Sequence, residues 1–208
     1  MATGSRAYTP AEAAAISEIA VKSVQNAIDK RIIEAHFGRA GRELSDQDLL
    51  RLKLWYGLGS ILSAERRKRL FDTIDQNPDA DTVRADDYLI VDVARAREQL
   101  VARAEALREA EQKIEAVKGG GGEPVFKGTR VPVRMIAAMK QQGASSEEII
   151  EGYPSVTARM VELAEIWAAA HPARGRPKKL SEQRLKAKSV KRLPLATAGS
   201  RKASGTAS

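Results

Sequence analysis

A short stretch near the N-terminus has the residue types that contact nucleic acid. Its polar members are Lys22, Ser23, Gln25, Asn26 and Lys30. Lysine and serine side chains can bind phosphate oxygens, and glutamine and asparagine amides can form hydrogen bonds with base edges. The apolar residues between them repeat at helical spacing and would be buried on the opposite face. This stretch therefore predicts a DNA-contacting helix face, although the solvated face of an ordinary helical hairpin has the same pattern.

The last part of the chain is a second candidate for binding polyanions. Residues 172–208 contain eleven Lys or Arg and one acid, whereas residues 1–171 contain 24 basic and 26 acidic residues. The net charge of +8 thus arises in the tail, and a basic tail favours polyanions or an acidic partner surface. A tail of this composition is expected to lack stable structure when free. A merely solubilising tail is the alternative.

The remaining chemistry-bearing residues do not form a pattern typical of an enzyme. The chain has no cysteine, and its two histidines, His36 and His171, are far apart in sequence. The aspartates between residues 72 and 87 lack the spacing of a calcium-binding loop. The glycine run at 119–122 is not followed by the Lys-Ser/Thr pair of a phosphate-binding loop. We therefore expect no enzymatic activity, no cofactor and no metal site.

Local signals predict that the N-terminal candidate face belongs to the second of two short helices within residues 9–33. Thr9 can cap the first helix, Pro10 suits its first turn, and Glu12 is placed to close a capping box. The glycine-containing stretch 38–41 then predicts a break in regular structure.

The middle of the chain favours further helices. Ser45 and Ser63 are expected to cap two of them, and the acidic segment 75–87 is expected to be a turn or linker. Residues 88–93 favour a short strand that leads into a helix ending near Val117. Apolar residues seven apart in this helix give a weak coiled-coil signal and would pack on their own domain or on a second subunit. They are Val93, Leu100, Leu107 and Ile114.

Beyond residues 119–122, which we interpret as a joint, the chain favours a small helical domain. Residues 123–133 alternate as in a strand, with Gly128 at a turn, and three helices are expected after them. The predicted fold class is all-α with minor β. The predicted parts are an N-terminal helical module (1–118), a C-terminal trihelical domain (119–171) and the basic tail (172–208).

Part of the N-terminal module resembles a known family. The stretch Tyr-Thr-Pro-Ala-Glu-Ala-Ala-Ala at 8–15, followed by Val-Lys-Ser-Val-Gln-Asn-Ala-Ile-Asp at 21–29, is similar to the N-terminal helix-turn-helix of MerR-type regulators. The resemblance covers about the first 35 residues. It implies that the second helix enters the major groove of DNA. A glycine that is common after this helix in the family is replaced by Arg31-Ile32-Ile33.

A second resemblance covers about residues 119–170. Gly-Glu-Pro-Val-Phe-Lys-Gly-Thr-Arg-Val-Pro-Val at 122–133 and Gly-Ala-Ser-Ser-Glu-Glu-Ile-Ile-Glu-Gly-Tyr-Pro at 143–154 resemble an antitoxin family of VapB type, formed by a domain of unknown function. The resemblance implies a homeodomain-like trihelical bundle with a short β-hairpin. Such a bundle contains a second helix-turn-helix, whose recognition helix would begin with Ser155, Thr157 and Arg159.

The antitoxin resemblance also implies a partner for the tail. Such antitoxins often cover a PIN-type ribonuclease with a C-terminal segment, whose arginines pair with the acidic residues that otherwise hold Mg²⁺. Pro-Ala-Arg-Gly-Arg-Pro-Lys-Lys at 172–179 also resembles an AT-hook, in which Arg-Gly-Arg-Pro lies in an A·T-rich minor groove. We favour toxin contact for the cationic residues of this motif and leave DNA contact open. They are Arg174, Arg176, Lys178 and Lys179.

These patterns together predict the antitoxin of a toxin–antitoxin pair. It would neutralise a PIN-type ribonuclease toxin and repress its own operon by binding operator DNA, as a homodimer or a larger toxin–antitoxin assembly. A free-standing transcriptional regulator or nucleoid factor is the alternative, and a nucleic-acid enzyme is disfavoured because catalytic residues are missing. No signal-peptide pattern precedes Tyr8 and no long uncharged apolar run occurs, so we expect a cytoplasmic protein without membrane contact.

Overall fold

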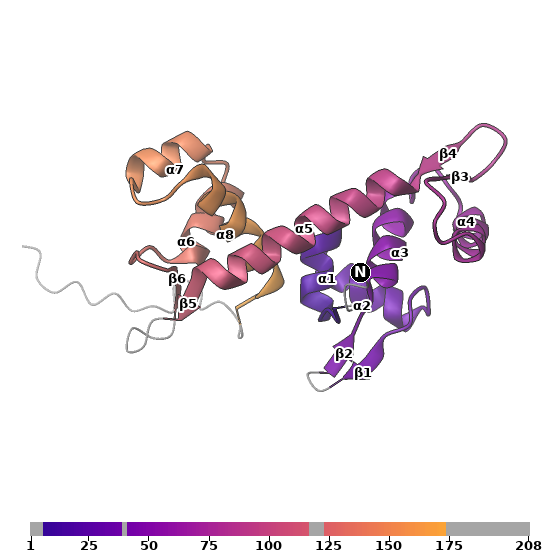
Figure 1. The fold of residues 1–208 in the computed structure, drawn as a ribbon, viewed down its shortest axis with the longest axis horizontal. Helices are drawn as coiled ribbons and strands as arrows, with labels where there is room; N and C mark the ends of the chain where they lie inside the picture. The colour runs from indigo at the N-terminus through magenta and orange to yellow at the C-terminus, as the bar shows by residue number, and fades with distance from the viewer. Residues whose placement is uncertain (1–5, 39–40, 117–122, 174–208) are drawn as a thin grey trace, which may run out of the picture. The chain divides into compact units, whose positions relative to one another are not determined.

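The computed structural model describes residues 6–38, 41–116 and 123–173, most of which lie in helices (Figure 1). Within these residues, three small antiparallel two-stranded sheets accompany the helices, which confirms the predicted class of all-α with minor β. None of the helices in these ranges is long and apolar enough to cross a membrane. The helices are α1 (Pro10–Ser17), α2 (Val21–Asp29), α3 (Asp46–Gly57), α4 (Ala64–Gln76), α5 (Val93–Lys113), α6 (Val133–Gln141), α7 (Ser146–Gly152) and α8 (Ala158–Ala170). The paired strands are β1 (His36–Gly38) with β2 (Gly41–Glu43), β3 (Thr82–Arg84) with β4 (Ile90–Asp92), and β5 (Ile114–Ala116) with β6 (Pro124–Phe126).

The helix starts predicted at Thr9, Ser45 and Ser63 are confirmed. At each start, a side chain accepts a hydrogen bond from a backbone N–H group of the first turn that has no partner within the helix. Thr9 Oγ1 accepts a hydrogen bond from Glu12 N at 3.3 Å, and the Glu12 carboxylate accepts one from Thr9 N at 2.7 Å. Both halves of the predicted capping box of α1 are thus formed. Ser45 and Ser63 cap α3 and α4 in the same manner, through Asp48 N and Arg66 N.

Arg31 ends α2 in a backbone conformation that favours glycine. Its φ is 54°. The N–H of Arg31 donates to Ile28 O at 3.0 Å, and the N–H of Ile32 donates to Ala27 O at 2.8 Å. These two bonds are those of a Schellman motif, in which the left-handed position is usually glycine. The arginine therefore adopts the turn that a glycine would make, and the chain continues into β1.

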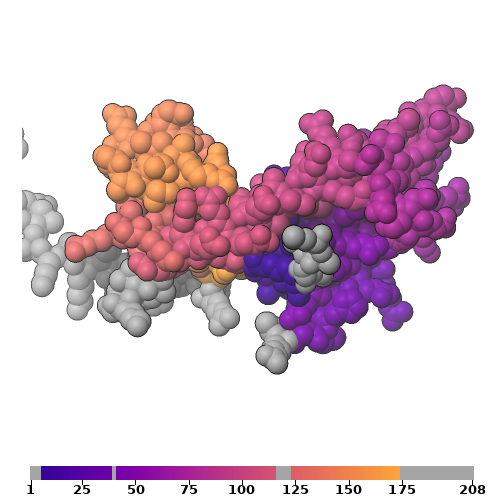
Figure 2. All heavy atoms as spheres, in the orientation of Figure 1, coloured from indigo at the N-terminus to yellow at the C-terminus, as the bar shows by residue number. Residues whose placement is uncertain are grey.

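Four strands lie where the sequence predicts none. Gly38 and Gly41, from the stretch interpreted as a break, pair as the end residues of β1 and β2, and β3 lies inside the segment 75–87, interpreted as a turn or linker. In Figure 2 the loop between β3 and β4 projects at the upper right. Helix α5 ends at Lys113 and not near Val117, because the next three residues pair as β5 with β6. Strands of three residues are too short to show a periodic pattern, so pairing alone defines them.

The predicted turn at Gly128 is confirmed, and its hairpin is one bridge long. Gly128 has a φ of 77°, Thr129 N donates to Phe126 O at 3.0 Å, and Val125 forms an antiparallel bridge with Pro132. Strand β6 takes its longer partner, β5, from the other side of residues 119–122. Residues 117–122, including the predicted joint, lie outside the described part of the chain.

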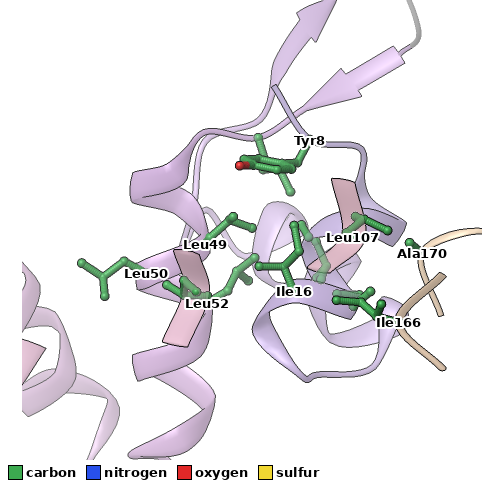
Figure 3. Packing of buried hydrophobic residues seen from close by; sticks show 14 of the residues in the cluster. Tyr8, Ile16, Leu49, Leu50, Leu52, Leu107, Ile166 and Ala170 are labelled. Carbon is green, nitrogen blue, oxygen red and sulfur yellow. The ribbon is translucent and has the colours of Figure 1, made fainter. Parts of the chain in front are cut away.

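Helix α1 lies at the centre of the hydrophobic core. Its last five residues, Ala13 to Ser17, are all buried, and α1 contacts α2, α3, α5 and α8. Figure 3 shows Ile16 of α1 between Leu52 of α3 on one side and Leu107 of α5 and Ile166 of α8 on the other. Alanine side chains on α1 allow the neighbouring helices to approach closely, so one short helix supports four others.

The apolar residues spaced by seven in α5 pack within their own chain. Val93 and Leu107 are 0% exposed, Leu100 is 6% exposed and Ile114 is 8% exposed. Ile114 belongs to β5 and not to the helix. Of the two predicted roles for this column, packing on its own domain is the one observed. Helix α8 also packs on α5 and α1, so the two predicted modules share this core.

Replacing Arg31 with glycine should stabilise the fold. A non-glycine residue in the left-handed conformation costs roughly 1–2 kcal/mol, and the greater freedom of glycine in the unfolded chain offsets about half of that gain. We expect Arg31→Gly to raise the free energy of unfolding in urea by about 0.5–1 kcal/mol. Arg31→Ala is the matched control, because it removes the same side chain but keeps Cβ. Equal stability of the two variants would contradict this account.

Candidate nucleic-acid interface

One face of α2 is polar and open to solvent. The side chains of Lys22, Gln25, Asn26 and Lys30 are exposed, whereas Val24 and Ala27 on the opposite face are fully buried. The residue types that could contact phosphates and base edges therefore lie together on the surface. The apolar face of the helix packs on the core.

Ser23 lies at the edge of this polar face and is half-buried. Its backbone carbonyl accepts a hydrogen bond from the hydroxyl of Tyr56, on α3, at 2.7 Å. Burial raises the pKa of Tyr56 above its ordinary value, which favours the protonated hydroxyl that donates this bond. This hydrogen bond therefore connects α3 to the first turn of α2.

The β1–β2 hairpin extends the exposed surface beside α2. The Arg42 guanidinium lies 3.7 Å from the carboxylate of Asp29 at the end of α2, and Phe37 is 85% exposed. Phe37 pairs with Arg42 across the two strands. The hairpin is not predicted from the sequence, because residues 39 and 40 are not of the types that mark a two-residue hairpin turn.

Glu18 ties the turn between α1 and α2 to two other helices. Its carboxylate lies 3.0 Å from the Lys53 ammonium of α3 and 3.1 Å from the Arg103 guanidinium of α5. Glu18 has a φ of 60°, a left-handed conformation that lets the chain reverse between the helices. Burial raises the pKa of Glu18, but the hydrogen bond from Lys53 and the charge of Arg103 outweigh it and hold the pKa below its ordinary value.

The second predicted set, at the start of α8, is arranged differently. Thr157 caps α8 by accepting a hydrogen bond from Met160 N, and Ser155 is exposed in the preceding loop. The Arg159 guanidinium lies 2.6 Å from Glu109 of α5 and 2.9 Å from Glu162. These carboxylates raise the pKa of Arg159 and neutralise its charge locally. Because α8 also packs against α1, α5, α6 and α7, it presents less free surface than α2.

Other sequence candidates lie apart from the α2 surface or outside the described residues. His171 ends α8 and stacks on Trp167, with ring centroids 4.6 Å apart. Among the described residues, no three His, Asp or Glu side chains are grouped as metal ligands would be. The cationic residues of the tail, Arg174, Arg176, Lys178 and Lys179, lie outside the described part of the chain.

Comparison with known proteins concerns the C-terminal part of the chain. Residues 119–168 match a family described as "Protein of unknown function (DUF433)". A protein named "Uncharacterized protein y4eO", from Sinorhizobium fredii (strain NBRC 101917 / NGR234), is 50% identical over 56 residues. The matched stretch spans 27% of this chain and 25% of that relative. No solved structure matches the chain.

The family match coincides with the stretch of the second sequence resemblance, a domain of unknown function that begins at residue 119. It contains β6, α6, α7 and nearly all of α8. The match leaves out α1, α2 and the β1–β2 hairpin, so the candidate interface rests on its own geometry.

Replacing Glu18 with glutamine should remove a pH-dependent part of the stability. Because the folded-state pKa of Glu18 is lower than its unfolded value of roughly 4.3, the ionised carboxylate stabilises the fold above that pH. The advantage of the wild type should be constant from about pH 6 to 8 and shrink as the pH falls below roughly 4.3, through the folded-state pKa. Urea denaturation at several pH values measures it.

Glu115→Gln is the matched control for this experiment, since Glu115 is an exposed carboxylate on β5. Its pH profile should follow the wild type. A Glu18→Gln protein whose stability also runs parallel to the wild type at every pH would show that the ion pairs at the turn contribute nothing.

Proposed function

We propose that this chain is a DNA-binding antitoxin, which binds operator DNA through α2 and the β1–β2 hairpin and neutralises a PIN-type ribonuclease. One observation carries the DNA-binding part. Helix α2 exposes a polar face beside an exposed hairpin, and α2 packs on the core through α1.

The arrangement of α1, α2 and the β1–β2 hairpin would suit a helix-turn-helix with a wing. Helix α1 braces α2 across a three-residue connection, and a helix of nine residues, about 13 Å long, suits the major groove. Gln25 and Asn26 would then contact base edges, while Lys22 and Lys30 would contact phosphates. The hairpin would lie against the neighbouring phosphate backbone of the DNA.

Helix α2 is favoured over α8 as the DNA-reading helix. Arg159, the one cation of the second set, already forms ion pairs with Glu109 and Glu162. A DNA phosphate would have to displace two carboxylates to pair with it, at a cost in charge-assisted hydrogen bonds. In this proposal Ser155 and Thr157 are secondary DNA contacts.

The antitoxin part rests on the sequence resemblance of residues 119–170. The proposed partner is a cognate PIN-type ribonuclease, which the basic tail would contact through Arg174, Arg176, Lys178 and Lys179. A homodimer is part of the proposal, because helix-turn-helix proteins read two-fold operators as dimers. A cytoplasmic location, where operon and toxin are both accessible, is proposed with it.

A free-standing regulator or nucleoid factor is the second candidate. The AT-hook-like Arg-Gly-Arg-Pro at 174–177 favours it, because this sequence suits a narrow A·T-rich minor groove. A ribonuclease gene next to the gene of this chain, whose product co-purifies with it, supports the antitoxin. Absence of such a partner supports the regulator.

Removing the amides of Gln25 and Asn26 should abolish discrimination between operator and random DNA. Each base contact contributes about 1–3 kcal/mol of discrimination, roughly five- to two-hundredfold in affinity. The operator is first identified by selection from the promoter region of the gene, and binding is then measured by fluorescence anisotropy. The double variant Gln141→Ala/Gln142→Ala, at two exposed positions ending α6, should bind as the wild type does. Unchanged selectivity of the Gln25→Ala/Asn26→Ala protein would exclude α2 as the reading helix.

Replacing Arg174 and Arg176 with alanine should weaken inhibition of the ribonuclease more than operator binding. A charge-assisted pair contributes on the order of 1.5–3 kcal/mol, so the loss of two should weaken inhibition roughly a hundredfold or more. The ribonuclease assay and operator binding are measured on the same preparation. Intact inhibition together with loss of binding to A·T-rich DNA would make the tail a DNA element and support the second candidate.

A further inference from the structure

A groove with an apolar floor lies between α3, the end of α4 and α5. Its volume is about 470 Å³, which falls within the range typical of small-molecule sites. Buried side chains from all three helices line it, namely Leu49, Ile74 and Leu100. On α5 the lining residues extend from Arg97 to Arg108, a distance of roughly 16 Å at the rise of an α-helix. The groove is therefore elongated along α5.

Two of the charged groups at the rim of this groove already have partners. Arg6 forms ion pairs with Glu12 and Glu111, at 3.1 and 2.9 Å. Burial and the Asp46 carboxylate raise the pKa of Tyr8 to about 12. This favours the protonated hydroxyl, which interacts with Asp46. A ligand would therefore meet the other charged groups of the rim.

Arg97 places an uncompensated positive charge at one end of the groove. Its guanidinium donates to Ala80 O at 2.9 Å and to Pro78 O, and these neutral carbonyls hold it without cancelling its charge. Within the described part of the chain, Arg97 forms no ion pair. At the other end, Glu105 and Arg108 lie about one helical turn apart, so their opposite charges offset each other. One negative charge at the Arg97 end would complement this groove.

A small molecule fits this groove better than a macromolecule does. A stable protein interface buries roughly 800 Å² on each partner around an apolar centre. Among the described residues that line the groove, Val101 is the only large apolar side chain that is strongly exposed, at 57%. A docked protein, including a second copy of this chain, would remove the charged rim from water, whereas a small molecule leaves the rim hydrated. The chain's own residues 172–208 carry eleven cations, which Arg97 would repel.

We propose that this groove binds a medium-chain alkyl carboxylate, with the alkyl chain along the floor and the carboxylate at Arg97. The site goes beyond the proposed function and does not depend on it. Leucine, isoleucine, valine and alanine side chains form the apolar lining, and its one aromatic ring, that of Tyr8, is buried and offers no free face for stacking. An elongated aliphatic groove suits a flexible alkyl chain better than a flat aromatic ring. Because the carbonyls of Pro78 and Ala80 already orient Arg97, binding would cost little side-chain entropy there.

The test measures the binding of decanoate to the full chain by titration calorimetry. The wild type should bind decanoate, whereas decylamine, which has the same alkyl chain and a positive charge at neutral pH, should not bind. Arg97→Gln should weaken decanoate binding roughly ten- to a hundredfold, as expected for the loss of one charge-assisted hydrogen bond. Arg97→Lys keeps the charge and should retain part of the affinity. Arg95→Ala is the matched control, because Arg95 is an exposed arginine of α5 outside the groove and should bind as the wild type does.

A second variant tests the floor of the groove and leaves Arg97 in place. Ala104 is a half-buried residue of α5 that lines the groove. Ala104→Phe should fill the space and abolish decanoate binding. Far-UV circular dichroism and urea denaturation of each variant confirm that the fold is intact.

Several distinct outcomes would overturn the proposal. If Arg97→Gln and Ala104→Phe both bind decanoate as the wild type does, the groove is not the site. If decylamine binds the wild type as tightly as decanoate, the carboxylate is not recognised. If the wild type does not bind decanoate and Ala104→Phe has a lower mass in light scattering, a second copy covers the groove. If decanoate binds only after Leu193→Ser/Leu195→Ser, the chain's own tail occupies the groove.

Discussion

The guanidinium of Arg103 joins the long helix α5 to the end of α1, 88 residues earlier in the chain. It donates to Ala15 O from Nε at 3.2 Å and from a terminal nitrogen at 2.8 Å, and it pairs with Glu18. The last carbonyls of a helix lack partners and carry partial negative charge, so a guanidinium there forms charge-assisted hydrogen bonds. The direction in which the chain leaves α1 for α2 therefore depends on α5.

The small residues of α1 determine how many helices can pack against it. Because Ala13, Ala14 and Ala15 are almost fully buried, α2, α3, α5 and α8 can all contact a helix of eight residues. The helix that would read DNA and the last helix of the C-terminal domain thus share one support. Larger side chains at these positions would force the helices apart, since close-packed cores lose stability when they are overfilled.

The helices could be predicted because their signals are local. Thr9, Ser45 and Ser63 each lie within three residues of the N–H group that they cap, and periodicity places Val24 and Ala27 inside. The contacts of Arg103 and Tyr56 could not be predicted, because their partners are 88 and 33 residues away. The candidate site was likewise predictable only where it depends on residues close together in the sequence. The polar face of α2 follows from spacing, but the reason to prefer it over α8 is the ion pair of Arg159 with Glu109, 50 residues apart.

The charge of residues 1–171 is unevenly distributed along the chain. These residues carry a net charge of −2, of which residues 72–92 alone contribute −6, so the rest carries +4. A uniformly neutral surface would attract neither DNA nor a cationic protein over distance, whereas separated charges steer both. The exposed cations of α2 and the acidic β3–β4 hairpin lie on different elements, each held by its own contacts to the core. Under the proposed function, the cations of α2 would meet DNA phosphates, and the acidic hairpin, which lies on a different element, would not oppose them.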